Sequence, residues 1–578
     1  MKNSEIADLF DRMGKLLEIK GENVFKVRAY FKAAENIRLA GEDIETLSHQ
    51  ERLDEIAGLG AALKEKVSEY LDTGRVTAYE KLTREIPESI LQIVHIPSVG
   101  PKKAKLFFEQ LQVRNLDDLA HAIQDGKLST LPGIQAKTVA NIIKGLETVR
   151  AGQERLDLAS AWKTAHSVLQ ALEKLSAVKK ICVAGSLRRM KETVGDIDIL
   201  GVSGKPHDVM QAFVRLPAVK AVQAYGETKS SIRMESGIQV DLRVVEAKSF
   251  GAAWLYFTGS KNFNVKLRQR AMHRKMKINE YGVFAIKGKY EKKVAGRTEE
   301  ECFRTLDLPY IAPELREDIG ESLLFAPEPS LPDLVQDKDI RGDLHVHSTW
   351  SDGHDDMETL VQAARARHYV YLGISDHSPR LKIANGLPAA GLYKKKAEID
   401  ALNKKYAPFR VLLGTEVEID KDGELDYNEK ILGIFDIVIA AVHTGLEQDP
   451  RQLTHRMIRA CRHPLVDVLA HPFCRHIGKR PPVNIDFDEI CRVAAETRTL
   501  LEINAFPSRL DLDSAHIFHA ARRGVRLIIN TDAHRREHLD FMRYGVALAR
   551  RGWLEAGQIA NTLPVTRFLK SLKRNSNK

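Results

Sequence analysis

The sequence predicts a multidomain protein with a helical N-terminal region, a mixed α/β core and a C-terminal half of parallel βα units. Three observations predict it. Glycine turns recur between helical apolar patterns before Arg155, and two aspartates flank an isoleucine in a strand pattern at 196–198. After Arg341, short β-branched runs alternate with helical stretches. With 578 residues, 43% of them hydrophobic, the chain is long enough for several cores.

Three similar glycine turns mark the N-terminal region. They read Ile56-Ala57-Gly58-Leu59-Gly60, Ile96-Pro97-Ser98-Val99-Gly100 and Leu131-Pro132-Gly133-Ile134-Gln135, and a lysine-containing helical stretch follows each. This is the helix–hairpin–helix pattern, in which backbone N–H groups approach a phosphate and lysines add charge. The second and third turns carry Ser98 and Gln135 where glycine is usual, so they are expected either to bind more weakly or to be structural. The residues expected to contact DNA are Gly58, Gly60, Lys64, Gly100, Lys102, Lys103 and Gly133.

A cluster of carboxylates follows a Gly-Ser turn in the α/β core. Gly185 and Ser186 end the apolar strand pattern 181–184, and further along Asp196 and Asp198 flank Ile197. Residues two apart in a strand point to the same face, and Asp241 belongs to a second strand pattern. Like charges this close call for divalent cations, and the turn offers backbone N–H groups to a phosphate. The segment therefore predicts a site for two metal ions and a triphosphate.

Potential metal ligands end nearly every strand pattern of the C-terminal half. A single histidine at a strand end is usually a hydrogen-bonded structural residue, but the repeated placement argues against coincidence. In parallel βα barrels these strand ends converge on one face, so the side chains are expected to form one multinuclear site. Imidazole and carboxylate ligands suit Zn²⁺, Mn²⁺ or Fe²⁺. The candidates are His345, His347, Asp352, His377, Glu416, His443, His471, Asp532 and His534.

Composition excludes several classes of protein. The net charge of +10, from 88 basic and 78 acidic residues, permits a nucleic-acid partner without requiring one. The five cysteines are scattered, which fits reduced buried thiols rather than disulfides. No apolar run reaches membrane-spanning length. We therefore expect a cytoplasmic, nucleoid-associated protein without membrane contact.

Two parts of the chain resemble known families. The Gly185-to-Asp198 segment, Asp241 and Tyr256-Phe257-Thr258-Gly259-Ser260 together resemble the family X DNA polymerases. The histidine-rich half resembles the polymerase-and-histidinol-phosphatase (PHP) domain. The order of these parts resembles the bacterial and archaeal PolX family over essentially the whole chain. The resemblance implies an α/β nucleotidyltransferase polymerase core and a C-terminal distorted (β/α) PHP barrel.

The pattern and the resemblance together divide the chain into regions. The Pro-rich polar run 326–333 is expected to lie in a linker. The expected regions are 1–85, an N-terminal helical DNA-binding domain; 86–154, a helix–hairpin–helix DNA-binding region; 155–245, the polymerase palm; 246–320, a thumb-like nucleotide-selection domain; 321–338, the linker; and 339–578, the PHP phosphoesterase domain.

The resemblance implies roles for the polymerase residues. Asp196 and Asp198 would bind two catalytic Mg²⁺ or Mn²⁺ ions, and Asp241 would bind one of them and accept the primer 3′-hydroxyl proton. Gln239 departs from the basic residue of animal relatives, which would change how the primer terminus is held. The implied nucleotide-binding residues are Ser186, Arg189, Gly195 and Arg155 at the triphosphate, Tyr256, Phe257 and Gly259 in the turn at the sugar, and Asn264 at the base. Arg155 fits an ordinary surface charge equally well. The alternatives for Arg189 and Tyr256 are an ordinary surface charge and a core residue, respectively.

In the PHP half the resemblance implies up to three ions, Mn²⁺, Zn²⁺ or both. The first would be held by His345, His347, Glu416 and Asp532. Glu416 would bridge to a second, with His443 and His471, and the third would be held by Asp352, His377 and His534. The implied activity is 3′→5′ exonuclease and related phosphoesterase chemistry.

Lys66 has two interpretations. It aligns with the lysine that forms a Schiff base in the 5′-deoxyribose-phosphate lyases of this polymerase family, where cations such as Lys64 would favour the neutral amine. The alternative, which we favour, is that Lys66 only contacts a phosphate.

The leading hypothesis is a monomeric repair enzyme that acts on gapped or primer–template DNA with dNTPs. It would fill short gaps and trim 3′ ends. The main alternative is a PHP nuclease or phosphatase that uses the polymerase half as a DNA-binding scaffold, against which Asp196, Asp198 and Asp241 argue. A non-catalytic scaffold is disfavoured because buried unpaired carboxylates and histidines are costly. A small-molecule phosphatase is disfavoured by the attached DNA-binding architecture.

Overall fold

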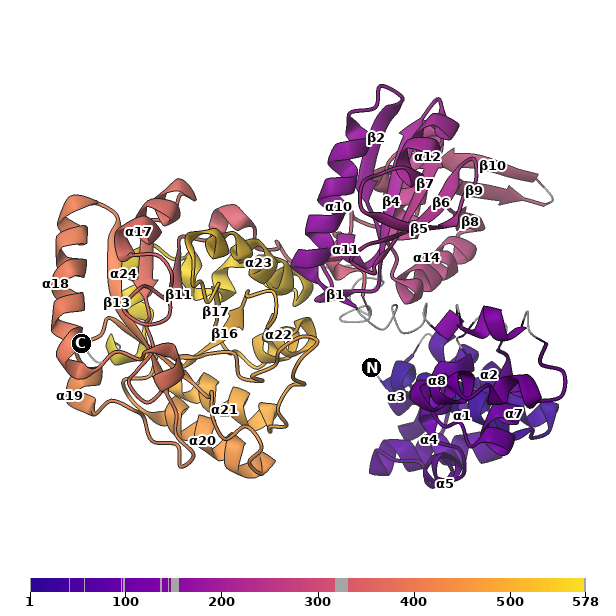
Figure 1. The fold of residues 1–578 in the computed structure, drawn as a ribbon, viewed down its shortest axis with the longest axis horizontal. Coiled ribbons are helices and arrows are strands. Elements are labelled where there is room, and N and C mark those ends of the chain that lie inside the picture. Colours follow the sequence, from indigo (N-terminus) through magenta and orange to yellow (C-terminus); the bar gives the residue numbers. More distant parts are fainter. Residues whose placement is uncertain are drawn as a thin grey trace. The chain divides into compact units, whose positions relative to one another are not determined.

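The computed structural model describes residues 2–575 except 41, 57, 95, 97–98, 136–137, 144, 147–154, 289 and 318–330. The chain divides into two compact units, Met1–Glu154 and Arg155–Lys578 (Figure 1). Pro97 and Ser98 of the second glycine turn and Lys137 after the third lie outside the described residues, as does most of the expected linker.

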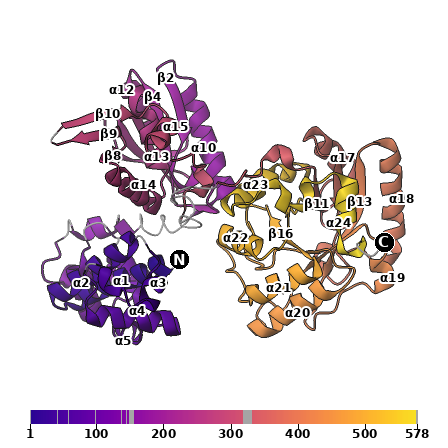
Figure 2. The ribbon, with the colours of Figure 1, turned by 180° about the vertical axis from the view of Figure 1, so that it is seen from behind.

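The first unit is helical (Figure 2), and buried apolar side chains form its core. Phe10 and Tyr30 pack edge to face in this core, with ring centroids 5.6 Å apart. The glycine turns lead into helices as expected: Gly60 is the N-cap of α4, and Gly100 is the N-cap of α7. The helices are α1 (Lys2–Lys20), α2 (Val24–Leu39), α3 (Ile44–His49), α4 (Ala61–Thr73), α5 (Thr77–Glu85), α6 (Leu91–Val94), α7 (Pro101–Leu111) and α8 (Leu116–Gln124).

The second unit begins with a mixed sheet. Within the described residues its strand order is β2-β4-β7-β6-β5, and β4 and β7 are parallel neighbours in the middle. Helices α10 and α12 bury their apolar faces in the core that contains this sheet. The elements are β1 (Leu156–Asp157), α10 (Leu158–Glu173), β2 (Val178–Val183), α11 (Gly185–Arg188), β3 (Thr193–Val194), β4 (Asp196–Ser203), α12 (Pro206–Val214), β5 (Val219–Ala224), β6 (Lys229–Met234) and β7 (Gln239–Val245).

A smaller antiparallel sheet with its own core follows. Glu299 ties it to the mixed sheet, because the Glu299 carboxylate pairs at 2.7 Å with buried Arg316 and at 2.6 Å with Arg188. Burial alone would raise the pKa of Glu299, but these guanidinium groups outweigh it and lower the pKa to about 2. The elements are α13 (Phe250–Thr258), α14 (Lys261–His273), β8 (Met276–Asn279), β9 (Gly282–Lys287), β10 (Tyr290–Ala295) and α15 (Glu299–Thr305).

The rest of the second unit is a nearly closed barrel. Strands β11 to β17 pair in chain order, all parallel in the part that the structure describes, and a bridge from Val346 to Ala533 links the two ends. Helices surround these strands in Figure 1, so the expected parallel βα architecture is confirmed. The strands are β11 (Gly342–Val346), β12 (Tyr371–Ile374), β13 (Arg410–Glu418), β14 (Ile437–Ala441), β15 (Val468–Leu469), β16 (Leu500–Asn504) and β17 (Leu527–Asn530). The helices are α17 (Met357–Ala366), α18 (Ala389–Lys405), α19 (Glu429–Leu432), α20 (Pro450–Arg462), α21 (Phe487–Thr497), α22 (Ser514–Arg522), α23 (Met542–Arg551) and α24 (Val565–Ser571).

The mixed sheet and the barrel share one hydrophobic core within the second unit. This core runs from α10 and β4 into α17, α23 and the barrel strands. Polar contacts join the same parts: Arg551 at the end of α23 donates a hydrogen bond to the backbone oxygen of Arg189 at 2.8 Å. Among the described residues, no helix is both long and apolar enough to cross a membrane.

Candidate active sites

Three carboxylates gather at the centre of the mixed sheet. In the parallel register of β4 and β7, Asp198 lies opposite Asp241 and Asp196 lies opposite Gln239. Gln239 Nε2 donates a hydrogen bond to Asp241 Oδ1 at 2.8 Å, so the residue that departs from the animal pattern holds one of the acids. The structure therefore brings together the three aspartates singled out from the sequence, which we call the Asp triad.

The Asp triad carries excess negative charge. Burial, together with the neighbouring charges of Asp196 and Asp241, raises the pKa of Asp198 to about 7. Burial and Asp241 also raise the pKa of Asp196, against a smaller opposing effect of Arg155. Divalent cations would compensate such charge, so the donor set fits them.

The Gly-Ser turn lies directly against the Asp triad. Gly185 begins α11 with φ +61°, in the left-handed region that favours glycine. A Cβ on Gly185 would lie 2.2 Å from Asp198 Oδ2, so a larger residue would displace this carboxylate. The Ala184 N–H donates to the backbone oxygen of Asp198 at 2.8 Å, which fixes the turn to β4.

The two arginines implied at the triphosphate both lie near the triad and both have protein partners. Arg155 donates to the side chain and backbone of Thr193 at 2.8 and 2.6 Å. Arg189 is only 9% exposed. Its Nε donates to Glu317 Oε1 at 2.6 Å, and a terminal nitrogen donates to the Thr258 carbonyl. Arg189 is therefore no ordinary surface charge.

Aromatic and amide groups follow at the end of α13. Tyr256 and Phe257 pack edge to face with centroids 5.1 Å apart, and Asn264 Nδ2 donates to the Tyr256 carbonyl at 2.7 Å. The Arg243 guanidinium lies over the Phe257 ring at 4.4 Å from its centroid. Arg243 also lowers the pKa of Asp198, against the larger effects of burial and the other acids. Sequence reasoning missed Arg243, although its place two residues after Asp241 puts both on one face of β7.

Nine side chains meet at the C-terminal ends of the barrel strands. They come from β11 and the loop after it, from the ends of β12, β14, β15 and β17, and from within β13. We call this group the histidine centre, and its members are His345, His347, Asp352, His377, Glu416, His443, His471, Asp532 and His534. All nine lie together, as the strand-end pattern indicated.

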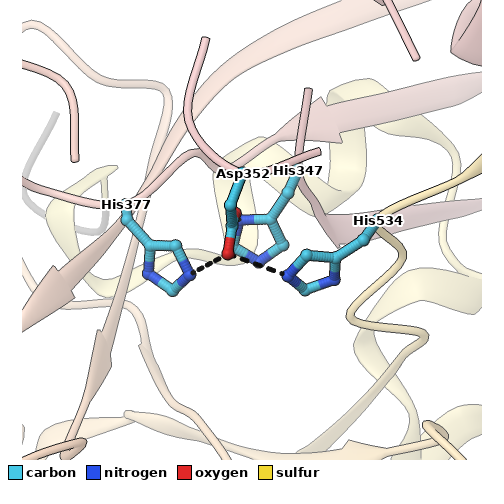
Figure 3. A group of neighbouring side chains, drawn as sticks. All are labelled: His347, Asp352, His377 and His534. Atoms are coloured by element: carbon cyan, nitrogen blue, oxygen red, sulfur yellow. Dashed lines mark ion pairs between the residues drawn. The ribbon is translucent and has the colours of Figure 1, made fainter. Parts of the chain in front are cut away.

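The donor atoms of the histidine centre form overlapping groups. Each of three groups keeps its donor atoms within 4.8 Å of one another: His347, Asp352, His377 and His534; His345, His347 and Asp532; and His377, Glu416 and His443. In Figure 3, one Asp352 oxygen faces His377 and His534, at 3.6 and 3.4 Å. His377 also lies 2.9 Å from Glu416, so it stands between two of the implied ion positions rather than at one alone.

Buried atoms without hydrogen-bond partners show that the histidine centre fits metal ions. Among its described side chains these atoms are His345 Nε2, both ring nitrogens of His347, Glu416 Oε2 and His471 Nδ1. Leaving such atoms unpaired in a protein interior is costly, and metal coordination would satisfy them.

The pKa shifts of two histidines in the histidine centre also fit metal binding. Burial, with repulsion from His534 and His377, lowers the pKa of His347 to about 4, so its ring is neutral and able to bind a metal. Burial would lower the pKa of His443 too, but Glu416 outweighs it and raises the pKa to about 9. The excess carboxylate charge that attracts this proton would also attract a cation.

The residues expected to contact DNA lie in the first unit. A cavity of about 900 Å³ lies beside the start of α7 and is lined by Gly100, Lys102 and Lys103 among others. In α4, Lys64 pairs with Asp54, and Lys66 Nζ donates to the Ala62 carbonyl at 2.8 Å. Lysines therefore flank both turns, although Lys64 has a carboxylate partner.

Comparisons with known proteins identify the family of this chain and several of its domains. Family models match a helix-hairpin-helix domain at residues 1–76, a SAM-like helix-hairpin-helix tandem at 90–148, the DNA polymerase beta thumb at 253–317 and the PHP domain at 343–505. The chain is 37% identical over 577 residues, the full length of both proteins, to the DNA polymerase/3′-5′ exonuclease PolX of Bacillus subtilis. The chain belongs to the PolX family, the family X DNA polymerases with a C-terminal PHP domain.

Other relatives match separate parts of this PolX-family chain. DNA polymerase lambda of Rattus norvegicus is 25% identical over 347 residues, which is 54% of this chain and 56% of that protein. A probable phosphatase of Thermoanaerobacter sp. is 30% identical over 205 residues, which is 33% of this chain and 78% of that protein. The predicted fold class is confirmed: helical hairpin region, polymerase core and PHP barrel.

Sequence reasoning missed the carboxylates that support the ligands of the PHP barrel. Glu502 Oε1 lies 2.7 Å from His345 Nδ1, and its second oxygen accepts from the His471 N–H at 3.0 Å. Glu418 Oε2 lies 2.7 Å from His443 Nδ1. Such carboxylates fix ring orientation and raise ligand basicity. The sequence feature that could have identified Glu502 is a glutamate inside an apolar strand pattern, Leu500-Leu501-Glu502-Ile503.

A buried ion pair lies next to the histidine centre. Lys395 Nζ is 2.8 Å from Asp376 Oδ2, and both side chains are fully buried. Asp376 also accepts from the Ser348 N–H and the Ser351 hydroxyl, at 2.7 and 2.8 Å. Because Asp376 precedes His377, this network fixes the loop that carries a candidate ligand.

Proposed function

We propose that this chain is a DNA polymerase that fills short gaps in DNA repair, with a 3′→5′ exonuclease in the PHP barrel that trims 3′ ends. The observation that carries the proposal is the presence of two separate acidic centres on one chain, the Asp triad in the mixed sheet and the histidine centre in the barrel. The activities printed in the name of the Bacillus subtilis relative support it.

The Asp triad would hold two Mg²⁺ or Mn²⁺ ions. When bound, such ions would stabilise the charge that develops on the phosphate oxygens. Asp241 is the proposed proton acceptor: Gln239 holds its Oδ1, and Oδ2 would take the proton of the primer 3′-hydroxyl. The freed oxygen forms a bond to the α-phosphorus, and pyrophosphate leaves with the electron pair of the bond that breaks.

The nucleotide would lie between the Gly-Ser turn and the end of α13. Ser186, Gly195, Arg155 and Arg189 are the proposed triphosphate contacts, because guanidinium groups and N–H donors stabilise phosphate charge. Two observations support the proposal: Arg155 and Arg189 both act to lower the pKa of Asp196, and Arg189 also acts to lower that of Asp198. Tyr256, Phe257 and Gly259 would border the sugar, and Asn264 the base.

The histidine centre would hold up to three Mn²⁺ or Zn²⁺ ions through its nine members. Bound ions would activate water for attack on a phosphodiester. The protein's own contribution is orientation: Glu502 fixes His345, and Glu418 fixes His443. Hydrolysis adds water across the terminal linkage, which releases one nucleotide and leaves a 3′-hydroxyl on the shortened strand.

The first unit would bind DNA through its phosphate backbone, independently of sequence. The glycine turns before α4 and α7 and the lysines beside them support this assignment. For Lys66 we favour phosphate contact, and the lyase alternative is tested by borohydride trapping of a covalent adduct with 5′-deoxyribose-phosphate DNA. We expect the enzyme to act as a monomer in the cytoplasm.

The test uses a 5′-phosphorylated single-nucleotide gap with a labelled primer, Mn²⁺, and dNTPs present or absent. Wild type, Asp198→Ala and His345→Ala are compared. We expect extension to be lost only in Asp198→Ala and shortening to be lost only in His345→Ala.

Shortening without any extension by the wild type would instead favour the nuclease that uses its polymerase half as a scaffold. Loss of both activities in either variant would contradict the model of two separate centres.

A further inference from the structure

The PHP barrel reaches one of the proposed triphosphate contacts through a chain of charged groups. Arg189 Nε donates to Glu317 Oε1 at 2.6 Å, and Arg551 of α23 lies 3.4 Å from the same oxygen. Arg551 also donates to the Arg189 backbone oxygen at 2.8 Å and to Ser514 Oγ at 3.3 Å. Glu317 therefore lies between an arginine of the polymerase region and an arginine of the barrel.

All three side chains are largely buried. The exposed fractions of the side chains are 11% for Arg189, 14% for Glu317 and 4% for Arg551. Burial alone would raise the pKa of Glu317, but Arg189, Arg551 and Lys191 outweigh it and lower the pKa. Glu317 is thus ionised and depends on its cations, because a buried carboxylate without a partner is costly.

This geometry creates a competition. If a triphosphate takes the guanidinium of Arg189, as the proposed function holds, Glu317 loses a partner. Among the described residues its remaining ion-pair partner is then Arg551, which comes from the barrel, while Lys191 contributes only at longer range. With Arg551 in place, Glu317 stays paired and Arg189 can be released; without it, releasing Arg189 would leave Glu317 short of compensation.

We propose that Arg551 is a positioning residue of the PHP barrel for nucleotide binding: it keeps Glu317 compensated while Arg189 transfers from Glu317 to the triphosphate of an incoming dNTP. Glu317 is accordingly an internal competitor of the dNTP. The inference rests on the proposed triphosphate contact of Arg189. It assigns the barrel a part in polymerisation that is separate from its hydrolytic centre.

The test compares the full-length wild type with Arg551→Gln, Glu317→Gln and the double variant. We measure kcat and KM for insertion of one dNTP into gapped DNA. Arg551→Gln should raise the KM for dNTP about fivefold or more, the usual scale of coupling between sites, with little change in kcat. Glu317→Gln should lower the KM below the wild-type value. The KM of the double variant should also lie at or below the wild-type value, because an uncharged side chain at position 317 needs no cation.

Three controls separate positioning from simple support of the structure. Arg550→Gln removes a neighbouring interface contact, since Arg550 pairs with Glu314 at 2.7 Å, and should leave the KM for dNTP unchanged. Arg551→Lys keeps the charge and should restore most of the wild-type KM. Hydrolysis of single-stranded DNA should be the same in all of these variants if the barrel is intact.

An unchanged KM in Arg551→Gln, or a KM still raised in the double variant, would overturn the inference. If Arg551→Gln does not fold, Glu317→Gln tests the inference alone. A KM for dNTP in Glu317→Gln that is equal to or above the wild-type KM would then count against the inference. Arg189→Ala tests the underlying proposal: if it leaves the KM for dNTP unchanged, the triphosphate role of Arg189 itself fails. If only Arg189→Ala raises the KM, that role stands and the coupling to the barrel fails.

Discussion

At the scale of single residues, the two centres handle negative charge in different ways. In the Asp triad the negative charge is largely uncompensated. Burial, followed by repulsion from Asp196 and Asp241, raises the pKa of Asp198 to about 7. The histidine centre surrounds its carboxylates with imidazoles, and their attraction outweighs burial and holds the pKa of Glu416 well below its ordinary value. Removing a charged group is therefore expected to have opposite effects on stability at the two centres.

Asp198→Asn is expected to stabilise the metal-free protein at neutral pH while abolishing extension. The folded pKa of Asp198 lies above its unfolded value of about 4, so the folded state binds the extra proton. Stability is therefore lost as pH rises from about 4 through 7. An uncharged residue avoids this loss, which is at most about 4 kcal/mol for a shift of about three pKa units. Thermal unfolding in EDTA across this pH range measures it. A variant no more stable than wild type at about pH 8 would contradict the raised pKa.

Glu502→Gln is expected to weaken shortening of DNA about 10- to 100-fold while extension continues, because the His345 ring loses the carboxylate that orients it. Metal affinity, read by isothermal titration with Mn²⁺, should fall with it. Glu489→Gln is the matched control: Glu489 is a half-exposed glutamate of α21 that pairs with Arg492, and its substitution should change neither. Equal exonuclease rates in wild type and Glu502→Gln would show that His345 does not need this partner.

At the scale of elements, the strand period explains why the candidate sites could be predicted. The period of two placed Asp196 and Asp198 on one face of a strand, and the convergence of parallel strand ends placed His345 and His534 in one group. Strand patterns mark Glu502 only as a glutamate within an apolar strand, and they do not mark Arg551 at all. The role of each depends on which residues far away in the sequence it contacts. Periodicity describes the face of an element, whereas pairing across elements depends on packing.

The turn between β2 and α11 provides a prediction at this scale. Gly185→Ala should abolish extension and leave shortening intact. The new Cβ would lie 2.2 Å from Asp198 Oδ2, and the positive φ at this position disfavours any side chain. Gly204→Ala is the control, because a Cβ there meets no described atom within 4 Å. Primer extension and hydrolysis assays on the two variants check this, and normal extension by Gly185→Ala would show that the turn tolerates the displacement.

At the scale of the whole molecule, the sequence predicted the order of the parts and the parallel barrel correctly, but not the core that the mixed sheet and the barrel share. That core was invisible because each segment by itself shows an ordinary amphipathic pattern. The shared core implies that the polymerase region depends on the barrel for part of its stability.

A chain that ends at Glu317 is therefore expected to unfold at a lower temperature than the polymerase region does in the full-length protein. Removing the barrel exposes apolar residues of α10 and removes the hydrogen bond from Arg551 to Arg189. Thermal unfolding followed by circular dichroism, for the full chain and for 1–317, measures the difference. Equal melting temperatures for the polymerase region would mean that the shared core contributes nothing to it.

The histidine centre also has a consequence for the order of synthesis. The Asp triad is complete once the ribosome has released residues up to Asp241, but the other centre needs ligands from His345 through His534, contributed by strands at both ends of the barrel. Long-range pairing of this kind forms late in folding. A nascent or truncated chain would thus complete its polymerase site before its exonuclease site. Incomplete chains would therefore lack the activity that degrades DNA.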